Sequence, residues 1–113
     1  MLIHMAYNPE IAERIAEILA ETPGITSKQM FGGLSFMLNG NMLIGVDKER
    51  LMVRIGKERY EEYLQLEGAQ EMDFTKKPMK GFLFIDETGF STDKDLETWI
   101  DRCVDFVSTL PNK

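Results

Sequence analysis

The sequence is poor in the residues that carry most enzyme and metal chemistry. It has one histidine and one cysteine in 113 residues. The single cysteine, Cys103, excludes an internal disulfide and agrees with a reducing compartment. The single histidine, His4, cannot form a catalytic dyad or a histidine-based metal site within one copy of the chain. We therefore expect no enzyme activity, no metal and no cofactor.

Long apolar runs are also missing. Glycine, asparagine or a charged residue interrupts each apolar stretch before it reaches the roughly 20 residues of a membrane helix. The first residues are too few for the apolar part of a secretory signal. We expect a cytoplasmic protein without a membrane partner, in which residues 1–4 form a flexible extension of no assigned function.

Positive charge is in deficit, because the net charge is −6 and the pI is about 4.8. Both terminal segments are acidic, whereas the middle of the chain is nearly balanced and holds three closely spaced lysines, Lys76, Lys77 and Lys80. An acidic protein is a poor general nucleic-acid binder, since phosphate contacts need a basic surface. A local basic patch remains open as an alternative.

The length and an apolar fraction of 43% predict one folded domain over residues 1–113. Apolar residues at helical spacing predict helices at residues 9–22 and 57–66, and from Ser91 or Thr92 to about residue 110. Asn8 is the expected N-cap of the first helix, and Gly68 is the expected C-terminal cap of the second.

Strands are predicted at residues 25–31, 34–38, 51–55 and 82–85, with one more after residue 40 and a short one at residues 72–74. Apart from that short strand, residues 69–81 are expected to be loop. Short connections between neighbouring strands favour antiparallel pairing. The predicted fold is therefore an α+β domain, with three helices packed on an antiparallel sheet of five to six strands.

The sequence Asn39-Gly40 is the strongest hairpin signal in the chain, because both residues accept positive φ. This turn predicts that Met37 faces Met42 and that Phe36 faces Leu43. It assigns the following residues to one face of the sheet: Ser35, Met37, Met42, Ile44 and Val46. It assigns Leu34, Phe36, Leu38 and Leu43 to the other. Both faces are then largely apolar, so we expect each to be covered.

Several short motifs occur together in a fixed order. They are Lys28-Gln-Met-Phe-Gly-Gly33, Leu34-Ser-Phe-Met-Leu-Asn-Gly40, Leu51-Met-Val-Arg54, Met72-Asp-Phe-Thr75, Pro78-Met-Lys-Gly81, Trp99, and Thr109-Leu-Pro111 with Lys113. With this set the chain, from about Met5 to its last residue, resembles the TfoX N-terminal domain family.

The resemblance implies an α+β unit similar to secretion-chaperone-like folds, which are commonly dimeric. Longer family members, the Sxy/TfoX regulators of bacterial competence, add a helical C-terminal domain and act as coactivators with the cyclic-AMP receptor protein. This chain ends after the first domain, so the resemblance carries over the domain and leaves a competence role open. It implies a regulatory domain that binds a protein partner, such as a transcription regulator, and forms a homodimer.

Some single-domain members carry a methyltransferase label, which the residues support little. A nucleotide site needs a glycine-rich turn between a strand and a helix, whereas Gly32-Gly33 leads into another strand. We favour a bulge or tight bend there over a ligand loop. Cys103 lies on the apolar stripe of the last helix, where a cysteine behaves as a small hydrophobe.

Candidate interaction residues remain. Six methionines lie in or near strands and form either core, the more common case, or an adaptable partner surface. Arg54 shares a strand face with Met52 and is interpreted as the anchor of a structural ion pair. The candidate set is Lys28, Met37, Met42, Arg54, Lys76, Lys77 and Lys80. The leading hypothesis is a non-enzymatic interaction domain, ahead of a nucleic-acid-associated regulator that binds through the lysines and of a cryptic enzyme.

Overall fold

The computed structural model describes residues 7–30, 32–72 and 79–113. Within these residues the predicted α+β fold is confirmed. The elements follow in the order α1 (Pro9–Ile18), β1 (Ile25–Met30), β2 (Gly33–Leu38), β3 (Asn41–Asp47), β4 (Arg50–Arg54), α2 (Tyr60–Leu64), β5 (Ala69–Glu71), β6 (Phe82–Ile85), a 3₁₀ turn η1 (Glu87–Gly89) and α3 (Asp93–Val107).

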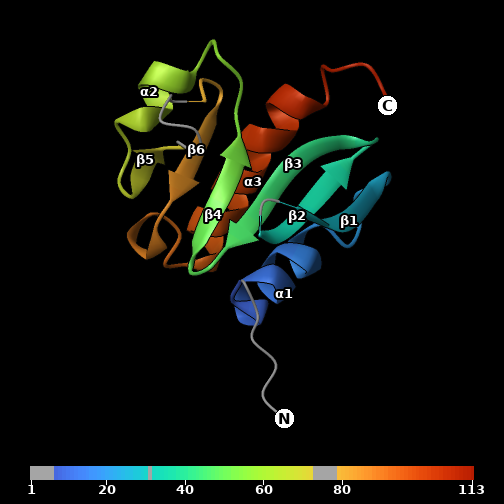
Figure 1. The fold of residues 1–113 in the computed structure, drawn as a ribbon, viewed down its shortest axis with the longest axis horizontal. Helices are drawn as coiled ribbons and strands as arrows, with labels where there is room; N and C mark the ends of the chain where they lie inside the picture. Colours follow the sequence, from blue (N-terminus) through green and yellow to red (C-terminus); the bar gives the residue numbers. More distant parts are fainter. Residues whose placement is uncertain (1–6, 31, 73–78) are drawn as a thin grey trace.

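The strands form one antiparallel sheet in the order β1-β2-β3-β4-β6-β5. Figure 1 views this sheet from the side opposite α3, which passes behind β3 and β4, with α1 at the lower end of the sheet and α2 beside β5 and β6. The apolar stripe predicted for the last helix is confirmed, since Leu96, Trp99, Ile100, Cys103 and Val107 are all buried. Together with Ile11, Ile15 and Leu19, they form the inner core between the two helices and the sheet.

Local capping sets the helix starts. The Asn8 side chain accepts a hydrogen bond from the Glu10 N–H at 2.8 Å, which confirms the predicted N-cap of α1. Of the two candidates for α3, Thr92 is the cap, because its hydroxyl accepts from the Asp95 N–H at 3.0 Å. All three helices end before their predicted limits, because their last residues form single turns rather than a further helical ladder.

The β2–β3 hairpin has the predicted turn, but the pairing of its two strands differs from the predicted register. Asn39 and Gly40 both have positive φ, and Met37 pairs with Met42. The prediction that Phe36 faces Leu43 is wrong, since a bulge between Phe36 and Met37 pairs Phe36 with Ile44. One extra residue moves every later side chain to the opposite face. Ile44 and Val46 consequently belong to the inner core and not to the face of Met37 and Met42.

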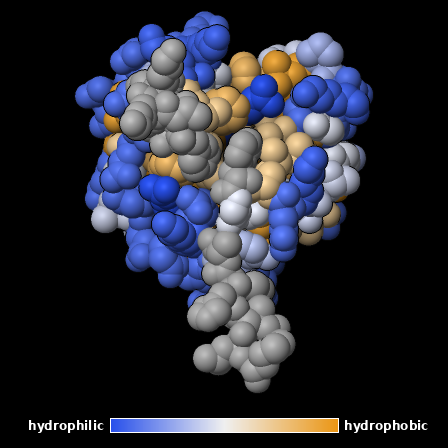
Figure 2. Space-filling model, in the orientation of Figure 1, coloured by the Kyte–Doolittle hydropathy of each residue, from blue (hydrophilic) through white to orange (hydrophobic). Residues whose placement is uncertain are grey.

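The outer face of the sheet carries a second apolar cluster, here called the outer cluster. Its buried members are Met42, Met52, Met72 and Phe84, and Met37, Met79 and Phe82 pack around them partly exposed. In the described part of the chain, no residue of a helix belongs to this cluster. Figure 2 shows apolar side chains on this face between hydrophilic ones. The expected pair of apolar faces is thus present, and the helices of the described residues cover only one of them.

The far edge of the sheet differs from the predicted one. Residues 69–71 were predicted to be loop, but they form β5, which pairs with β6 through only three residues. Its side chains are mostly exposed and show no apolar pattern that could have revealed a strand. The short strand predicted at residues 72–74 lies mostly outside the described residues.

Candidate functional site

The Gly32-Gly33 pair has a structural role. Gly32 has φ +76°, in the left-handed region that favours glycine, where β1 turns into β2. A Cβ on Gly33 would lie 2.1 Å from the Val46 carbonyl oxygen, so any side chain there would clash with β3. A tight turn and a close strand approach thus account for both glycines, and the predicted bend is confirmed.

Cys103 is fully buried among apolar residues of the inner core. Burial raises the pKa of its thiol to about 12, which keeps the sulfur protonated at neutral pH. A protonated and enclosed thiol is a poor nucleophile, so Cys103 has the structural place predicted for it. Across residues 7–30, 32–72 and 79–113, no three His, Cys, Asp or Glu side chains gather as a metal site.

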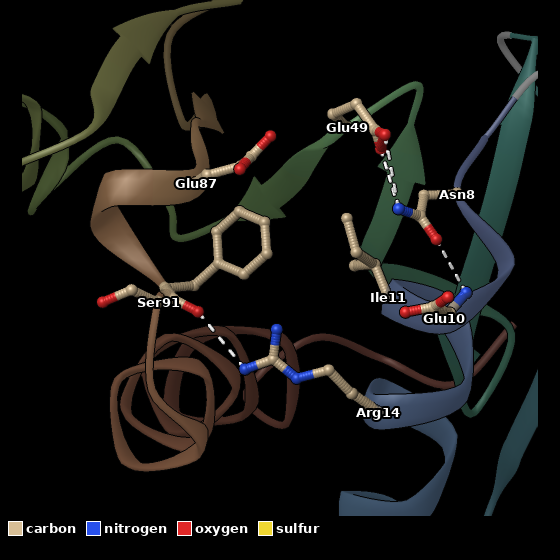
Figure 3. Close-up of a pocket in the computed structure, with 8 residues that line it drawn as sticks. Asn8, Glu10, Ile11, Arg14, Glu49, Glu87 and Ser91 are labelled. Atoms are coloured by element: carbon tan, nitrogen blue, oxygen red, sulfur yellow. Dashed lines mark hydrogen bonds between the residues drawn. The ribbon is translucent and has the colours of Figure 1, made fainter.

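A polar cleft of about 390 Å³ lies between the start of α1, the β3–β4 turn and η1 (Figure 3). The residues lining it are Asn8, Glu10, Ile11, Arg14, Glu49, Glu87, Phe90 and Ser91. Its main polar groups already bond to one another. The Asn8 amide donates to Glu49 at 2.8 Å, and Arg14 donates to the Phe90 carbonyl at 3.3 Å and pairs with Asp93.

The chemistry available in the polar cleft is limited. Ser91 has no histidine or lysine among the lining residues to activate its hydroxyl. The three glutamates are partly balanced by Arg14, whose guanidinium is itself engaged. The contacts in this cleft tie α1 to the loop before α3, which is a structural role.

A second pocket, of about 320 Å³, is lined mainly by basic and aromatic side chains. It lies where β4 ends, β6 begins and the last turn of α3 passes, and we call it the basic pocket. Its lining residues are Arg54, Gly56, Lys57, Glu58, Lys80, Gly81, Phe82 and Phe106. Among the described residues, three cations and two phenylalanines therefore surround one cavity, with Glu58 as the single acid.

Arg54 is the most constrained of these cations. Its guanidinium lies 5.4 Å from the centre of the Phe82 ring and 5.9 Å from that of Phe106. Its Nη1 donates a long hydrogen bond of 3.4 Å to the Met42 carbonyl. None of the ion pairs among the described residues includes Arg54, since they join Arg14 to Asp93, Arg50 to Asp47 and Arg59 to Glu62. Partial burial accordingly lowers the pKa of Arg54.

The candidate residues divide among three places. Arg54 and Lys80 meet at the basic pocket, whereas Lys28 lies exposed on the edge strand β1. Met37 borders the outer cluster partly exposed, but Met42 is only 6% exposed and offers a partner little surface. Lys76 and Lys77 lie outside the described residues. Lys57 and Phe106 were missed, because residues far apart in sequence form this pocket only after folding.

The fold and its surfaces define an α+β domain with a helix-covered sheet, an outer methionine-rich cluster and one basic pocket. The model of the TfoX N-terminal domain matches residues 17–107. The chain therefore belongs to the TfoX N-terminal domain family. No curated protein and no solved structure matches the chain. In the part of the chain that the structure describes, no helix has the length and apolarity needed to cross a membrane.

Proposed function

We propose that this domain is a non-catalytic regulatory module that binds a protein partner through the outer face of its sheet, with a second copy of itself as the first such partner. The observation that supports the proposal is the outer cluster. Its border residues Met37, Met79 and Phe82 are partly exposed on a face that no described helix covers. Flexible methionine side chains suit a surface that packs against another protein.

Membership of the family adds to this support. A regulatory role in the manner of the competence regulators, and a transcription regulator as a further partner, are the expectations that membership carries. The same face would serve both the second copy and that regulator, so the two would compete for it. No catalytic step enters this proposal.

Sedimentation equilibrium of the purified chain over a wide concentration range tests the dimer. We expect a concentration-dependent dimer for the unchanged chain and a monomer for Met37→Glu, because a carboxylate at the border of the cluster would be desolvated in the interface. Leu66→Glu is the matched control, since Leu66 is 37% exposed beside α2 and does not belong to the outer cluster.

Far-UV circular dichroism of each variant shows whether it keeps its fold. A monomer at the highest concentration of the unchanged chain would remove the dimer from the proposal. Dissociation by Leu66→Glu and not by Met37→Glu would place the interface elsewhere.

A second candidate function is a nucleic-acid-associated regulator. The observation that favours it is that Arg54, Lys57 and Lys80 line one pocket. In the sequence, Lys76 and Lys77 closely precede Lys80. Phosphate contacts predict binding that weakens steeply with salt. Fluorescence anisotropy with a labelled DNA duplex at two salt concentrations measures this. Equal binding by the triple Lys→Ala variant at positions 76, 77 and 80 would exclude these lysines from any such interface.

A further inference from the structure

The basic pocket concentrates positive charge on a protein that is otherwise acidic. The net charge of the chain is −6, yet Arg54, Lys57 and Lys80 line this one cavity, and Glu58 is the single acid among its described lining residues. Like charges are normally spread apart on a surface because their repulsion costs free energy. A cluster that keeps three cations together is stabilised when an anion binds among them.

Arg54 shows most clearly that the charge is unmatched. It is half-buried, its hydrogen bond to the Met42 carbonyl is long, and no carboxylate pairs with it in the described residues. A partly desolvated guanidinium has lost hydration that only a charged acceptor restores fully. Its planar fork suits the two oxygens of a carboxylate or phosphate.

Apart from the charged side chains, the described residues that line the pocket are two phenylalanines and two glycines. Phe106 packs directly on Gly56, where a Cβ would lie 2.5 Å from the ring, so the ring position depends on that glycine. The Gly81 carbonyl accepts from the N–H groups of Ile55 at 2.9 Å and of Gly56 at 3.1 Å. These bonds fix the ends of β4 and β6 around the cavity. Phe82 provides a second ring at the wall. A flat apolar group would find a preformed surface here.

We propose that the basic pocket binds a small organic anion that carries one carboxylate or phosphate on a flat apolar body. The cations hold the anionic group, and the two phenylalanines contact the ring. The volume of about 320 Å³ is at the lower end of small-molecule sites and suits one ring system. A nucleic-acid strand suits it less, because the acidic remainder of the protein repels a polyanion along its length.

Chemical-shift mapping of the amides of the full chain tests this site. The anionic probes are 2-naphthoate and adenosine 5′-monophosphate, which distinguish a carboxylate from a phosphate source. The matched controls are 2-naphthylmethanol, which lacks the charge, and inorganic phosphate, which lacks the ring. We expect at least one anionic probe to shift the amides of Gly56, Lys57, Gly81 and Phe82 and to bind at least about tenfold more tightly than either control.

Substitutions assign the roles. Lys57→Ala and Lys80→Ala remove exposed side chains and should each weaken binding several-fold, and Arg54→Met, which keeps the apolar stem, should weaken it about tenfold or more. Lys94→Ala, at the far end of α3, should leave binding unchanged. Lys80→Ala should also leave the oligomeric state unchanged. A failure of the ligand-binding proposal can therefore be distinguished from a failure of the dimer proposal.

Three outcomes would overturn the proposal. The first is no shift of these amides by either anionic probe at millimolar concentration. The second is equal binding of the neutral control, which would indicate an adventitious apolar contact. The third is a single-stranded oligonucleotide that binds there much more tightly than the mononucleotide, with a steep salt dependence, which would assign the pocket to nucleic acid.

Discussion

The inner face of the sheet is lined mainly by branched aliphatic side chains, whereas the outer face is lined by methionine and phenylalanine. On the inner face, Ile44, Val53 and Leu83 are fully buried under two helices whose own apolar stripes match the sheet. On the outer face, Met52 is fully buried and Phe84 is nearly so, but no helix of the described residues packs on them.

The difference separates two ways of burying a sheet. Branched side chains have few rotamers and specify one packing arrangement, whereas methionine is flexible and adapts to irregular space. The outer face also uses charge. The Arg50 guanidinium lies 3.5 Å from the centre of the Phe84 ring and pairs with the buried Asp47 at 3.0 Å. We infer that the inner face specifies the fold and that the outer face tolerates change, which fits a surface for partners.

The largest expected effect is on the inner face, for Trp99→Ala. Trp99 is buried, its Nε1 donates to the Gly89 carbonyl at 3.1 Å, and its ring packs edge to face with Tyr63 at 6.0 Å. Removing it should lower the free energy of unfolding by about 3–5 kcal/mol. Urea denaturation measures this, with Trp99→Phe as the milder control. A loss below about 1 kcal/mol, the level of an ordinary surface change, would contradict the assigned rigidity of the inner core.

The corresponding change on the outer face is Met52→Ala. Met52 is fully buried in the outer cluster, so a cavity forms there too, but its methionine neighbours can partly fill the space. We expect a loss of about 2–3 kcal/mol, at the lower end of the range for such truncations, and less than about 1.5 kcal/mol for Met52→Leu. If Met52→Ala costs as much as Trp99→Ala in the same denaturation series, the two faces do not differ in adaptability.

Much of this architecture follows from local signals in the sequence. The Asn39-Gly40 turn, the Asn8 cap and the apolar stripe of α3 each depend on residues within a few positions of one another. Such signals need no distant partner, which is why they could be predicted. The placement of Met52 and Arg54 on one face of β4 followed from strict alternation. It is confirmed, because Met52 lies in the outer cluster and Arg54 lies near Phe82 at its border.

The features that escaped prediction depend on distant partners. The bulge that turns Ile44 to the inner face did not follow from the turn signal, and Ile44 packs in the inner core with residues far away in the sequence. The basic pocket joins Arg54, Lys80 and Phe106 from three elements, and only the first two were candidates. Arg54 was expected to pair with an acid because a buried charge needs compensation. Two aromatic rings, from the start of β6 and the end of α3, supply part of that compensation.

A smaller effect is expected where charge stabilises the outer face, for Arg50→Met. The substitution keeps an apolar stem over Phe84 and removes both the cation–π contact and the partner of Asp47. We expect a loss of about 1–2 kcal/mol. Arg59→Met is the matched control, because its ion pair with Glu62 is exposed to solvent and should contribute little to stability. Equal losses for the two variants would mean that Arg50 does not support the outer face.

The smallest effect on stability is expected for Ser35→Ala, on the outer face of the sheet. Ser35 is fully buried, and its Oγ has no hydrogen-bond partner in the described part of the chain. It faces Gly45, where a Cβ would lie 2.8 Å from the methyl group of Met52. Removing an unsatisfied buried hydroxyl relieves its desolvation penalty, so Ser35→Ala should be neutral or stabilise the fold by up to about 1 kcal/mol.

Thermal denaturation of Ser35→Ala beside Ser27→Ala, an exposed position on β1, measures this. A loss of more than about 1 kcal/mol for Ser35→Ala alone would show that the hydroxyl has a partner in solution. Such a hydrogen bond would fix the packing of the outer face more tightly than flexible methionines alone. The two faces would then differ less in adaptability.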